Sequence, residues 1–538
     1  MKTLTAKVQP RMASLRFAFT LSLLVAGAPY CRAQTPAPAA SSSTPATASS
    51  ASTLQQQIDQ LVQSLNATRE ELNQSAQKIQ MLQQQVQQLQ QKLAAQQPPA
   101  SNGVPASTAP ADAYGRLSSA VSRLKEQQQI DQSEIAQHAQ SKVGTESKYP
   151  VELTGLLLFN GFVNDGAVDN LDLPIVALPR TATVAHGSTG ATLRQSIVGV
   201  AATGPRLWGA RSFADINIDF FGGLAPVDYQ ATNGVVRMRT AHAELSWNDT
   251  HAAFSLDRPL FSPRYPTSLM TVAAPALAWS GNLWAWNPQL TADHTFRFAG
   301  QQWLAMQAGV MDVPDPGHAA DLTQRTPSAA EKSRYPGSEL HLAVGHGAAD
   351  ASAQGYGEID PVAAAGIGGY WSPHDPVPGV HTDAWAGTFD WNLPLGRHLA
   401  WSGALYRGAS LGGLGGGVFK DYVLHRAMTS GGSGNVLWRP LNAAGGWAQA
   451  KFVASERWQM NIAGGEDNGY ARDLHWMNLA ATSNYSDLAR NQTIFGNVVY
   501  TPSAYLLFSV EYRKIRSWPI YGAENAAQTF GLAMGYQF

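Results

Sequence analysis

The charged residues with the most regular spacing lie in two short stretches of the chain. Asp215, Asn217 and Asp219 alternate with two isoleucines, and Arg237 and Arg239 flank a methionine. A spacing of two residues places side chains on one face of a β-strand. Carboxylates and guanidiniums held in this way attract and pair with ions. They therefore indicate recognition or guidance of charged solutes.

The second of these stretches changes phase along its length. Met238 is apolar at an even position, but farther along Leu245 is apolar while His242 and Glu244 are polar. A β-bulge inserts one extra residue and reverses the alternation that follows it. We therefore predict a bulge near Thr240-Ala241, which keeps the charged groups before and after it on the same face.

Motifs for catalysis or metal binding are weak. Gly408-Ala409-Ser410-Leu411-Gly412 has the letters of a nucleophile elbow, but a glycine-rich run to Gly417 follows where that motif requires a helix. His341 and His346 lack the spacing and companion ligands of a zinc site. We predict no catalytic residue, no metal site and no cofactor.

The last ten residues, 529–538, carry a clear strand pattern. Apolar or aromatic residues occupy every second position, and small or polar residues lie between them. An aromatic residue at the chain end is typical of strands delivered to the barrel assembly machinery of the outer membrane. The apolar positions, which we expect to act as the barrel-closing signal, are Phe530, Leu532, Met534, Tyr536 and Phe538.

The same alternation recurs throughout residues 150–538. The polar faces of these segments are mostly Gly, Ala, Ser and Asn with scattered charges, and aromatic residues gather at strand ends. An outward apolar band around a water-filled lumen has this pattern, whereas a soluble sandwich would carry more Lys and Glu. We predict an all-β transmembrane barrel of about 16 antiparallel strands, in which the last strand pairs with the segment near Val151.

Composition supports a membrane barrel over a helical membrane protein or a cytosolic enzyme. Charged residues make up 14% of the 538 residues, Gly accounts for 49, and the mean hydropathy is −0.18. No apolar run approaches the roughly 20 residues that a spanning helix needs. The net charge of −1 gives no indication of nucleic-acid binding.

The N-terminal part is predicted to be separate from the barrel. Residues 1–33 resemble a secretory signal cleaved after Ala33, with acylation at Cys31, the only cysteine, as the alternative. Residues 34–53 form a low-complexity linker, and a heptad run over 54–94 predicts a coiled coil. A proline-rich linker at 95–114 and a second short helix at 115–140 follow. The coil serves either as a trimerising stalk or as an envelope tether.

Within the barrel we predict a charged lumen narrowed by a loop. Stretches rich in Gly, Pro and Ser at 163–191, 258–285, 313–336 and 408–445 predict loops, and the prolines of 258–285 make it stiff enough to fold inward. Arg258 and Arg264 are its constriction candidates. The pore-lining candidates are Asp215, Asn217, Asp219, Arg237, Arg239, His242, Glu244, Arg457, Glu511 and Arg513.

Three arrangements of these charges remain open. The arginines could simply balance Asp215 and Asp219 across the wall. Alternatively, Arg237 and Arg239 could join the two constriction arginines in a basic ladder that draws anions. Opposed basic and acidic walls would instead give a transverse field and weak selectivity.

Three stretches resemble the DcaP-like trimeric porins, which are related to the phosphate-selective porins. They are Leu193-Arg194-Gln195-Ser196-Ile197-Val198-Gly199, the segment 214–222 (ADINIDFFG) and the segment 237–245 (RMRTAHAEL). The resemblance implies a 16-stranded barrel behind a periplasmic coiled coil, a homotrimer, and substrates that lean to small anions such as dicarboxylates.

From these observations we predict an outer-membrane porin of a Gram-negative-type bacterium, with its N-terminal coil in the periplasm. Its expected partners are two further copies of itself, membrane lipid and lipopolysaccharide, the barrel assembly machinery, small anionic solutes and, through the coil, peptidoglycan. The alternatives are a structural envelope tether with a barrel anchor, and an outer-membrane lipase that uses Ser410.

Overall fold

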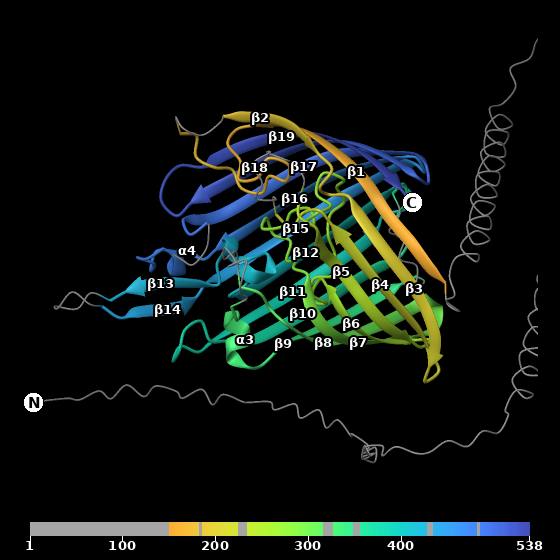
Figure 1. Ribbon diagram of the computed structural model, residues 1–538, viewed down its shortest axis with the longest axis horizontal. Helices are drawn as coiled ribbons and strands as arrows, with labels where there is room; N and C mark the ends of the chain where they lie inside the picture. The colour runs from red at the N-terminus through yellow and green to blue at the C-terminus, as the bar shows by residue number, and fades with distance from the viewer. Residues whose placement is uncertain are drawn as a thin grey trace, which may run out of the picture. The chain divides into compact units, whose positions relative to one another are not determined.

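The computed structural model of the protein describes residues 150–181, 186–223, 234–315, 326–347, 356–427, 434–480 and 485–538 (Figure 1). The predicted signal sequence, both linkers, the coiled coil and the second short helix lie outside the described residues. All the described elements belong to the predicted barrel region.

Long antiparallel strands make up most of the described chain. The strands are β1 (Val151–Asp165), β2 (Gly187–Thr192), β3 (Ile197–Leu207), β4 (Ala210–Asp219), β5 (Arg237–Ser246), β6 (Thr250–Asp257), β7 (Asn287–Arg297), β8 (Gln302–Met311), β9 (Gly337–His346), β10 (Ala363–His374), β11 (Thr382–Pro394), β12 (Leu399–Ala409), β13 (Tyr422–Arg426), β14 (Val436–Pro440), β15 (Asn442–Ser455), β16 (Trp458–Gly469), β17 (Leu488–Ser503), β18 (Leu506–Pro519) and β19 (Asn525–Gln537). The short helices are η1 (Ala299–Gln301), α3 (Ala329–Ser333), η2 (Gly412–Leu414), η3 (Gly417–Phe419) and α4 (Ala471–Leu474).

The main sheet closes on itself. Within the described residues it contains 17 strands, and its first strand, β1, pairs with the last, β19, from Leu156 opposite Gln537 to Asp165 opposite Gln528. β2 and β3 both pair with β1 in consecutive registers, so they are two halves of one interrupted strand. Counted in this way the barrel has 16 strands, which confirms the predicted number and the predicted closing pair.

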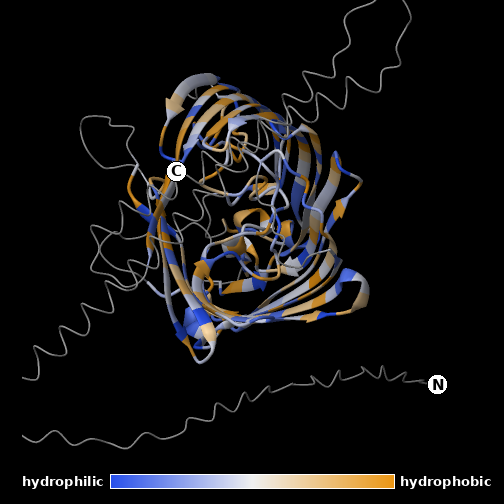
Figure 2. Cartoon of the chain, turned by 90° about the vertical axis from the view of Figure 1, so that its right-hand side faces the viewer, coloured by the Kyte–Doolittle hydropathy of each residue, from blue (hydrophilic) through white to orange (hydrophobic). Residues whose placement is uncertain are grey.

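The terminal strand presents its apolar side outward, as predicted. The side chains of Phe530, Leu532, Met534, Tyr536 and Phe538 are 39–55% exposed on the outer surface. Thr529 and Ala533, which alternate with them, are buried on the inner side. Figure 2 shows the same alternation of hydrophobic and hydrophilic residues along neighbouring strands.

Aromatic side chains form a belt on the outside near the end where β1 begins and β19 ends. Neighbouring rings stack across β16 to β19, with Trp458 on Tyr500 at 4.4 Å and Tyr500 on Phe508 at 6.4 Å between centroids. Tyr536 continues the belt by stacking on Phe538. We call this end of the barrel the terminal end and the opposite end the loop end.

Connections differ in length between the two ends. Most turns at the terminal end are short, such as Trp208-Gly209 and Ala504-Tyr505. The longer connections lie at the loop end and cover residues 166–186, 220–236, 258–286, 312–336 and 410–441. The predicted loops match four of these, although β1 continues to Asp165 and the last contains the separate hairpin β13–β14. Among the described helices none is long and apolar enough to cross a membrane.

Closure of the barrel depends on a close approach at Gly155. Its backbone N–H donates to the Phe538 carbonyl at 2.8 Å, and the Phe538 N–H donates back to the Gly155 carbonyl at 3.0 Å. A Cβ at Gly155 would lie 2.6 Å from Cζ of Phe538 and 2.7 Å from the Ile197 carbonyl oxygen. A side chain there would therefore displace the terminal ring or the neighbouring strand.

We expect Gly155→Ala to destabilise the folded barrel by about 1–3 kcal/mol because it overpacks the closing seam. Gly369→Ala on β10 is the matched control, since a Cβ there meets nothing within 4 Å. Urea midpoints of the purified, detergent-folded variants measure the difference. Equal midpoints for the two variants would contradict this role of the seam.

Candidate functional site in the lumen

The connection between β6 and β7, Arg258 to Trp286, runs inside the barrel. Figure 2 shows chain within the ring of strands. Thr267 donates its backbone N–H to Oε1 of Gln449 on β15 at 2.6 Å, and Ser280 hydrogen-bonds Thr493 on β17 at 2.9 Å. We call this segment, 258–286, the inner loop. The expectation that it folds inward agrees with these contacts.

The interruption between β2 and β3 attaches the inner loop to the wall. Four residues, 193–196, lie opposite three residues of β1, and the Ser196 hydroxyl accepts a hydrogen bond from the Leu158 N–H. The extra residue turns Gln195 inward, where it is fully buried. Its amide oxygen accepts from the N–H groups of Val272 and Ala273 at 2.8 and 3.0 Å.

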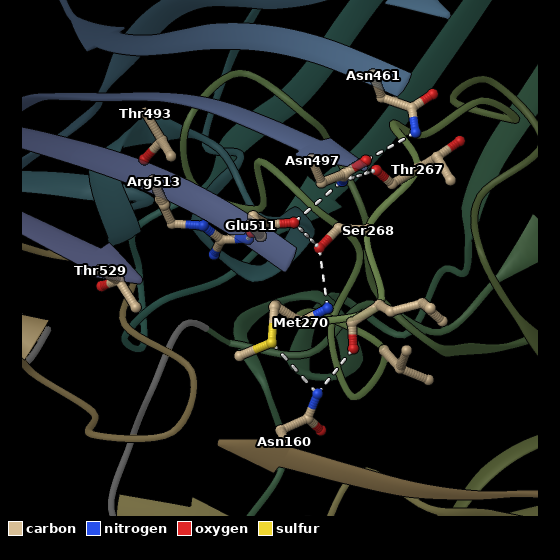
Figure 3. A network of polar contacts seen from close by, with 12 residues as sticks. Asn160, Thr267, Ser268, Met270, Asn461, Thr493, Asn497, Glu511, Arg513 and Thr529 are labelled. Carbon is tan, nitrogen blue, oxygen red and sulfur yellow. Dashed lines mark hydrogen bonds and ion pairs between the residues drawn. The ribbon is translucent and has the colours of Figure 1, made fainter. Parts of the chain in front are cut away.

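A second attachment involves the carboxylate of Glu511 on β18 (Figure 3). It accepts a hydrogen bond from the Ser268 hydroxyl at 2.5 Å and pairs with Arg513 at 2.6 Å. Asn497 on β17 donates to the Thr267 carbonyl at 2.9 Å and to the same carboxylate at 3.1 Å. The glutamate thus neutralises a buried arginine and at the same time holds the loop.

A third attachment holds the start of the inner loop against β9 and β11. Glu339 accepts from the Leu260 N–H at 2.6 Å, and Thr388 donates to the Phe261 carbonyl at 2.5 Å. Arg264 forms an ion pair of 2.6 Å with Asp390, which is buried and also bound by His341 at 2.7 Å. Both of these wall carboxylates lie behind the loop, away from the open part of the lumen.

Arginines and aromatic rings alternate where the inner loop meets β4 and β5. The Arg194 guanidinium lies 4.3 Å from the Phe221 ring centroid, and the Arg237 guanidinium lies 5.7 Å from the same centroid. Arg237 and Arg239 lie 4.8 and 5.2 Å from the Trp286 ring. Cations stacked on desolvated rings gain about 0.5–2 kcal/mol each, which fixes the guanidinium planes.

The predicted pore-lining residues of β4 and β5 come together on the inner wall. Arg237 pairs with Asp219 at 2.7 Å, and Arg239 lies 3.8 Å from the same carboxylate. His242 bridges Asp215 at 2.7 Å and Asp257, which was not among the predicted residues, at 3.1 Å.

Two further predicted residues lie on the same wall. Asn217 donates to Asp215 at 2.5 Å, and Glu244 contacts His251 at 2.8 Å. The predicted bulge is confirmed at Arg239. Thr240 pairs with Asn217, and Met238 pairs with Ile218, so Arg239 is the extra residue.

Three predicted lumen residues are placed differently from expectation. Glu511 and Arg513 point into the barrel but are buried beneath the inner loop, so they do not face open water. Arg457 lies in the exposed turn before β16 begins at Trp458, outside the strand that was expected to carry it. The alternation of the sequence correctly put Arg457 in phase with the inward residues of β16, but it did not show at which residue the strand starts.

A second segment enters the barrel at the loop end, from Ser410 to Asp421. Leu414 accepts a hydrogen bond from the Trp284 N–H at 2.9 Å. Lys420 is buried and donates to the carbonyls of Val418, Tyr485 and Leu488 at 2.9, 3.0 and 2.6 Å, and burial lowers the pKa of its amine to about 7.

Ser410 lies within this segment and is itself buried. Its hydroxyl donates to the Asp421 carbonyl at 3.1 Å, an arrangement that does not present a nucleophile to solvent. Among the described residues, no group of three or more His, Cys, Asp or Glu side chains could hold a metal ion.

A cavity of about 660 Å³ lies inside the barrel between the inner loop and the strand wall. Cationic side chains outnumber carboxylates in its lining by four to two. The cations are Arg239, Arg258, Arg264 and Lys451, and the carboxylates are Asp257 and Asp360. Arg258 stacks on Tyr265 at 4.1 Å, and among the described residues its guanidinium forms no ion pair with a carboxylate, although the charge of the adjacent Asp257 acts on it. The cavity therefore presents a net positive lining to a solute.

Several lining residues were missed by the sequence analysis. Lys451 alternates with the outward residues of β15, so the sequence pattern could have identified it as an inward residue. Tyr356 and Asp360 come from the connection between β9 and β10, which carried no strand pattern and no loop prediction. Arg194 and Gln195, which do not line the cavity but contact Phe221 and the inner loop, were noted only as part of a resemblance.

We expect Gln195→Leu to loosen the inner loop, because two buried N–H groups lose their acceptor at a cost of about 1–3 kcal/mol each. Gln528→Leu is the control, since Gln528 binds only the exposed Tyr512 hydroxyl among the described contacts. Limited proteolysis of the folded barrel should cleave within 258–286 in the first variant alone. A cleavage pattern identical to the wild type would contradict the anchoring role.

No family model matches the sequence, and no curated protein sequence matches it. Among solved structures, the outer membrane channel DcaP of Acinetobacter baumannii has a TM-score of 0.51 at 15% identity, over 73% of this chain and 99% of that chain. The anion-selective porin from Comamonas acidovorans has a TM-score of 0.43 at 12% identity, over 73% and 100%. OmpT of Vibrio cholerae has 0.38 at 9%, over 73% and 99%.

The last two similarities are too low to support any conclusion. The first covers 99% of the DcaP chain, and at this identity it supports the fold alone. The resemblance seen in the sequence is thus confirmed at the level of the fold: this chain has the closed β-barrel fold of the outer membrane channel DcaP.

Proposed function

We propose that the protein is an outer-membrane porin that lets small hydrophilic solutes diffuse through its lumen, with a moderate preference for anions. The observation that carries this proposal is the 660 Å³ cavity inside the barrel, whose lining has four cationic side chains and two carboxylates. A charged, water-accessible interior within an apolar outer surface suits passage of polar solutes across lipid.

The membrane placement follows from the outer surface. Large apolar side chains are exposed on strands all around the barrel, for example Ile216, Phe254, Ile367 and Ile462. In lipid these faces are buried favourably, whereas a charged side chain at the bilayer midplane costs about 2–4 kcal/mol for Arg or Lys. The terminal end, with its aromatic belt and short turns, faces the periplasm in this proposal, and the long loops face outward.

Anion preference rests on where the paired carboxylates lie. Asp219 and Asp390 are almost fully buried behind their arginines, while the arginine side chains remain 21–28% exposed. A solute thus meets the guanidinium first and the carboxylate only at greater distance. Because the buried carboxylates weaken the positive field of the arginines, we propose only a moderate preference for anions. This proposal lies between two of the arrangements that the sequence left open, the balanced charges and the basic ladder.

Arg258 is the residue best suited to test this preference because it lines the cavity and its guanidinium forms no ion pair with a carboxylate of the described residues. We expect Arg258→Gln to lower the chloride-to-potassium permeability ratio roughly twofold, since one lining charge changes the local potential by about kT. Reversal potentials of single channels in a KCl gradient measure the ratio. Arg206→Gln, at an exposed position near the end of β3, is the control and should leave the ratio unchanged.

Two outcomes would contradict the proposal. Cation preference in the wild-type channel, unchanged in Arg258→Gln and Arg264→Gln, would remove the anion-selective lining. A folded protein without any ion conductance would remove the porin function and favour the envelope tether.

The homotrimer is part of the same proposal. It is supported by the heptad seam predicted over residues 54–94, because such a seam is buried only against other helices. The full-length protein is expected to have the mass of three chains in light scattering, and deletion of 54–93 should weaken the assembly. A monomeric full-length protein would contradict the trimer, and peptidoglycan co-sedimentation lost on the same deletion would support the tether.

A further inference from the structure

The connection between β9 and β10 is unusual for its end of the barrel. It covers residues 347–362, whereas the neighbouring terminal-end connections cover 298–301 and 395–398. Its described part, Tyr356 to Val362, does not remain at the rim. Tyr356 and Asp360 line the lumen cavity together with the inner loop.

Gly357 places this segment against β16, four strands away from β10 in the sheet. Its N–H donates to Oε1 of Gln459 on β16 at 3.0 Å, and Gln459 is 1% exposed. A Cβ on Gly357, whose φ is +84°, would lie 2.0 Å from the Glu456 carbonyl oxygen. In the sheet order β10 and β16 are separated by β11, β12 and β15, so the segment extends inward from its own strands.

Tyr356 packs against an inner cluster on yet another part of the wall. The buried members of this cluster include Leu158 on β1, Val499 on β17, Leu507 on β18, and Leu269 from the inner loop. Tyr356 therefore packs against a cluster that is formed by the strand wall and the inner loop together. The two inward segments meet at this ring.

Asp360, near the C-terminal end of the segment, is held by hydrogen bonds to Val362 and to β11. Its carboxylate accepts from the Val362 N–H at 2.9 Å and from the Asn392 amide on β11 at 3.1 Å. Asn392 also donates to the Val362 carbonyl at 2.8 Å, which holds the turn to the wall. Asp360 and Lys451, on β15, then line the same cavity with opposite charges.

The cavity is thus bounded by two segments. The inner loop supplies the side toward the loop end with Arg258 and Arg264. Tyr356 and Asp360 lie with wall residues near the terminal end, since Asn392 is close to the end of β11, and Lys451 to that of β15. A solute that leaves the cavity toward the terminal end meets this second set of residues.

We propose that the segment Tyr356–Val362 is a second constriction at the terminal end, in which the Tyr356 ring limits the size of the passage and Asp360 opposes the cationic lining. This inference rests on the proposed porin function. It assigns the chamber between the two constrictions as the place where a small anion resides during passage, with arginines on one side and Lys451 on the other.

The size role is tested by single-channel conductance of the full-length protein in KCl. Tyr356→Ala should raise the conductance by roughly 1.5-fold, and Tyr356→Trp should lower it, because the ring occupies the cross-section that ions must share. Tyr521→Ala is the matched control, since Tyr521 is 74% exposed at the loop end, and it should conduct as the wild type does. Opposite changes in the two Tyr356 variants cannot come from misfolding alone.

The charge role is tested by reversal potential. Asp360→Asn should raise the chloride-to-potassium permeability ratio roughly twofold, since it leaves Lys451 without an opposing lining charge. Asp383→Asn, at an exposed position at the loop end, is the control. Wild-type conductance in both Tyr356 variants, or an unchanged ratio in Asp360→Asn, would overturn the second constriction. If Arg258→Gln still changes selectivity in that case, the porin function stands by itself.

Discussion

The structure of the lumen depends on one requirement: every backbone polar group of the inner loop must find a partner inside a closed barrel. Strand pairing already uses the hydrogen bonds of the wall, so the partners come from inward side chains. Gln195, Glu339, Gln449 and Asn497 each bind between one and three backbone groups of the segment. This explains why many inward positions of the barrel are polar yet buried.

The same requirement determines where charge can act on a solute. Carboxylates that hold the loop or balance an arginine lie behind it, as Glu511 and Asp390 do, and are largely shielded from the open lumen. The Arg258 guanidinium forms no such ion pair among the described residues and lies on the Tyr265 ring. The excess of positive charge at the cavity surface therefore follows from how the loop is attached to the wall.

Local alternation predicted the barrel well because it records a simple physical fact, which side of each strand meets an apolar environment. It gave the outward face of Phe530 to Phe538, the closing pair near Val151 and the bulge to within one residue. It could not predict that Glu511 and Arg513 are covered, since the covering residue Ser268 lies 243 positions from Glu511 in the chain. Nor could it identify the inward turn at Tyr356, because a turn has no periodicity.

The central claim is that the loops inside the barrel leave a charged path for solutes. The most direct test is the zero-current potential of the purified full-length protein in a planar bilayer under a KCl gradient, recorded together with its single-channel conductance. The structure predicts stable open channels with a moderate preference for chloride. A folded barrel that conducts no ions, or one that prefers potassium, would contradict it.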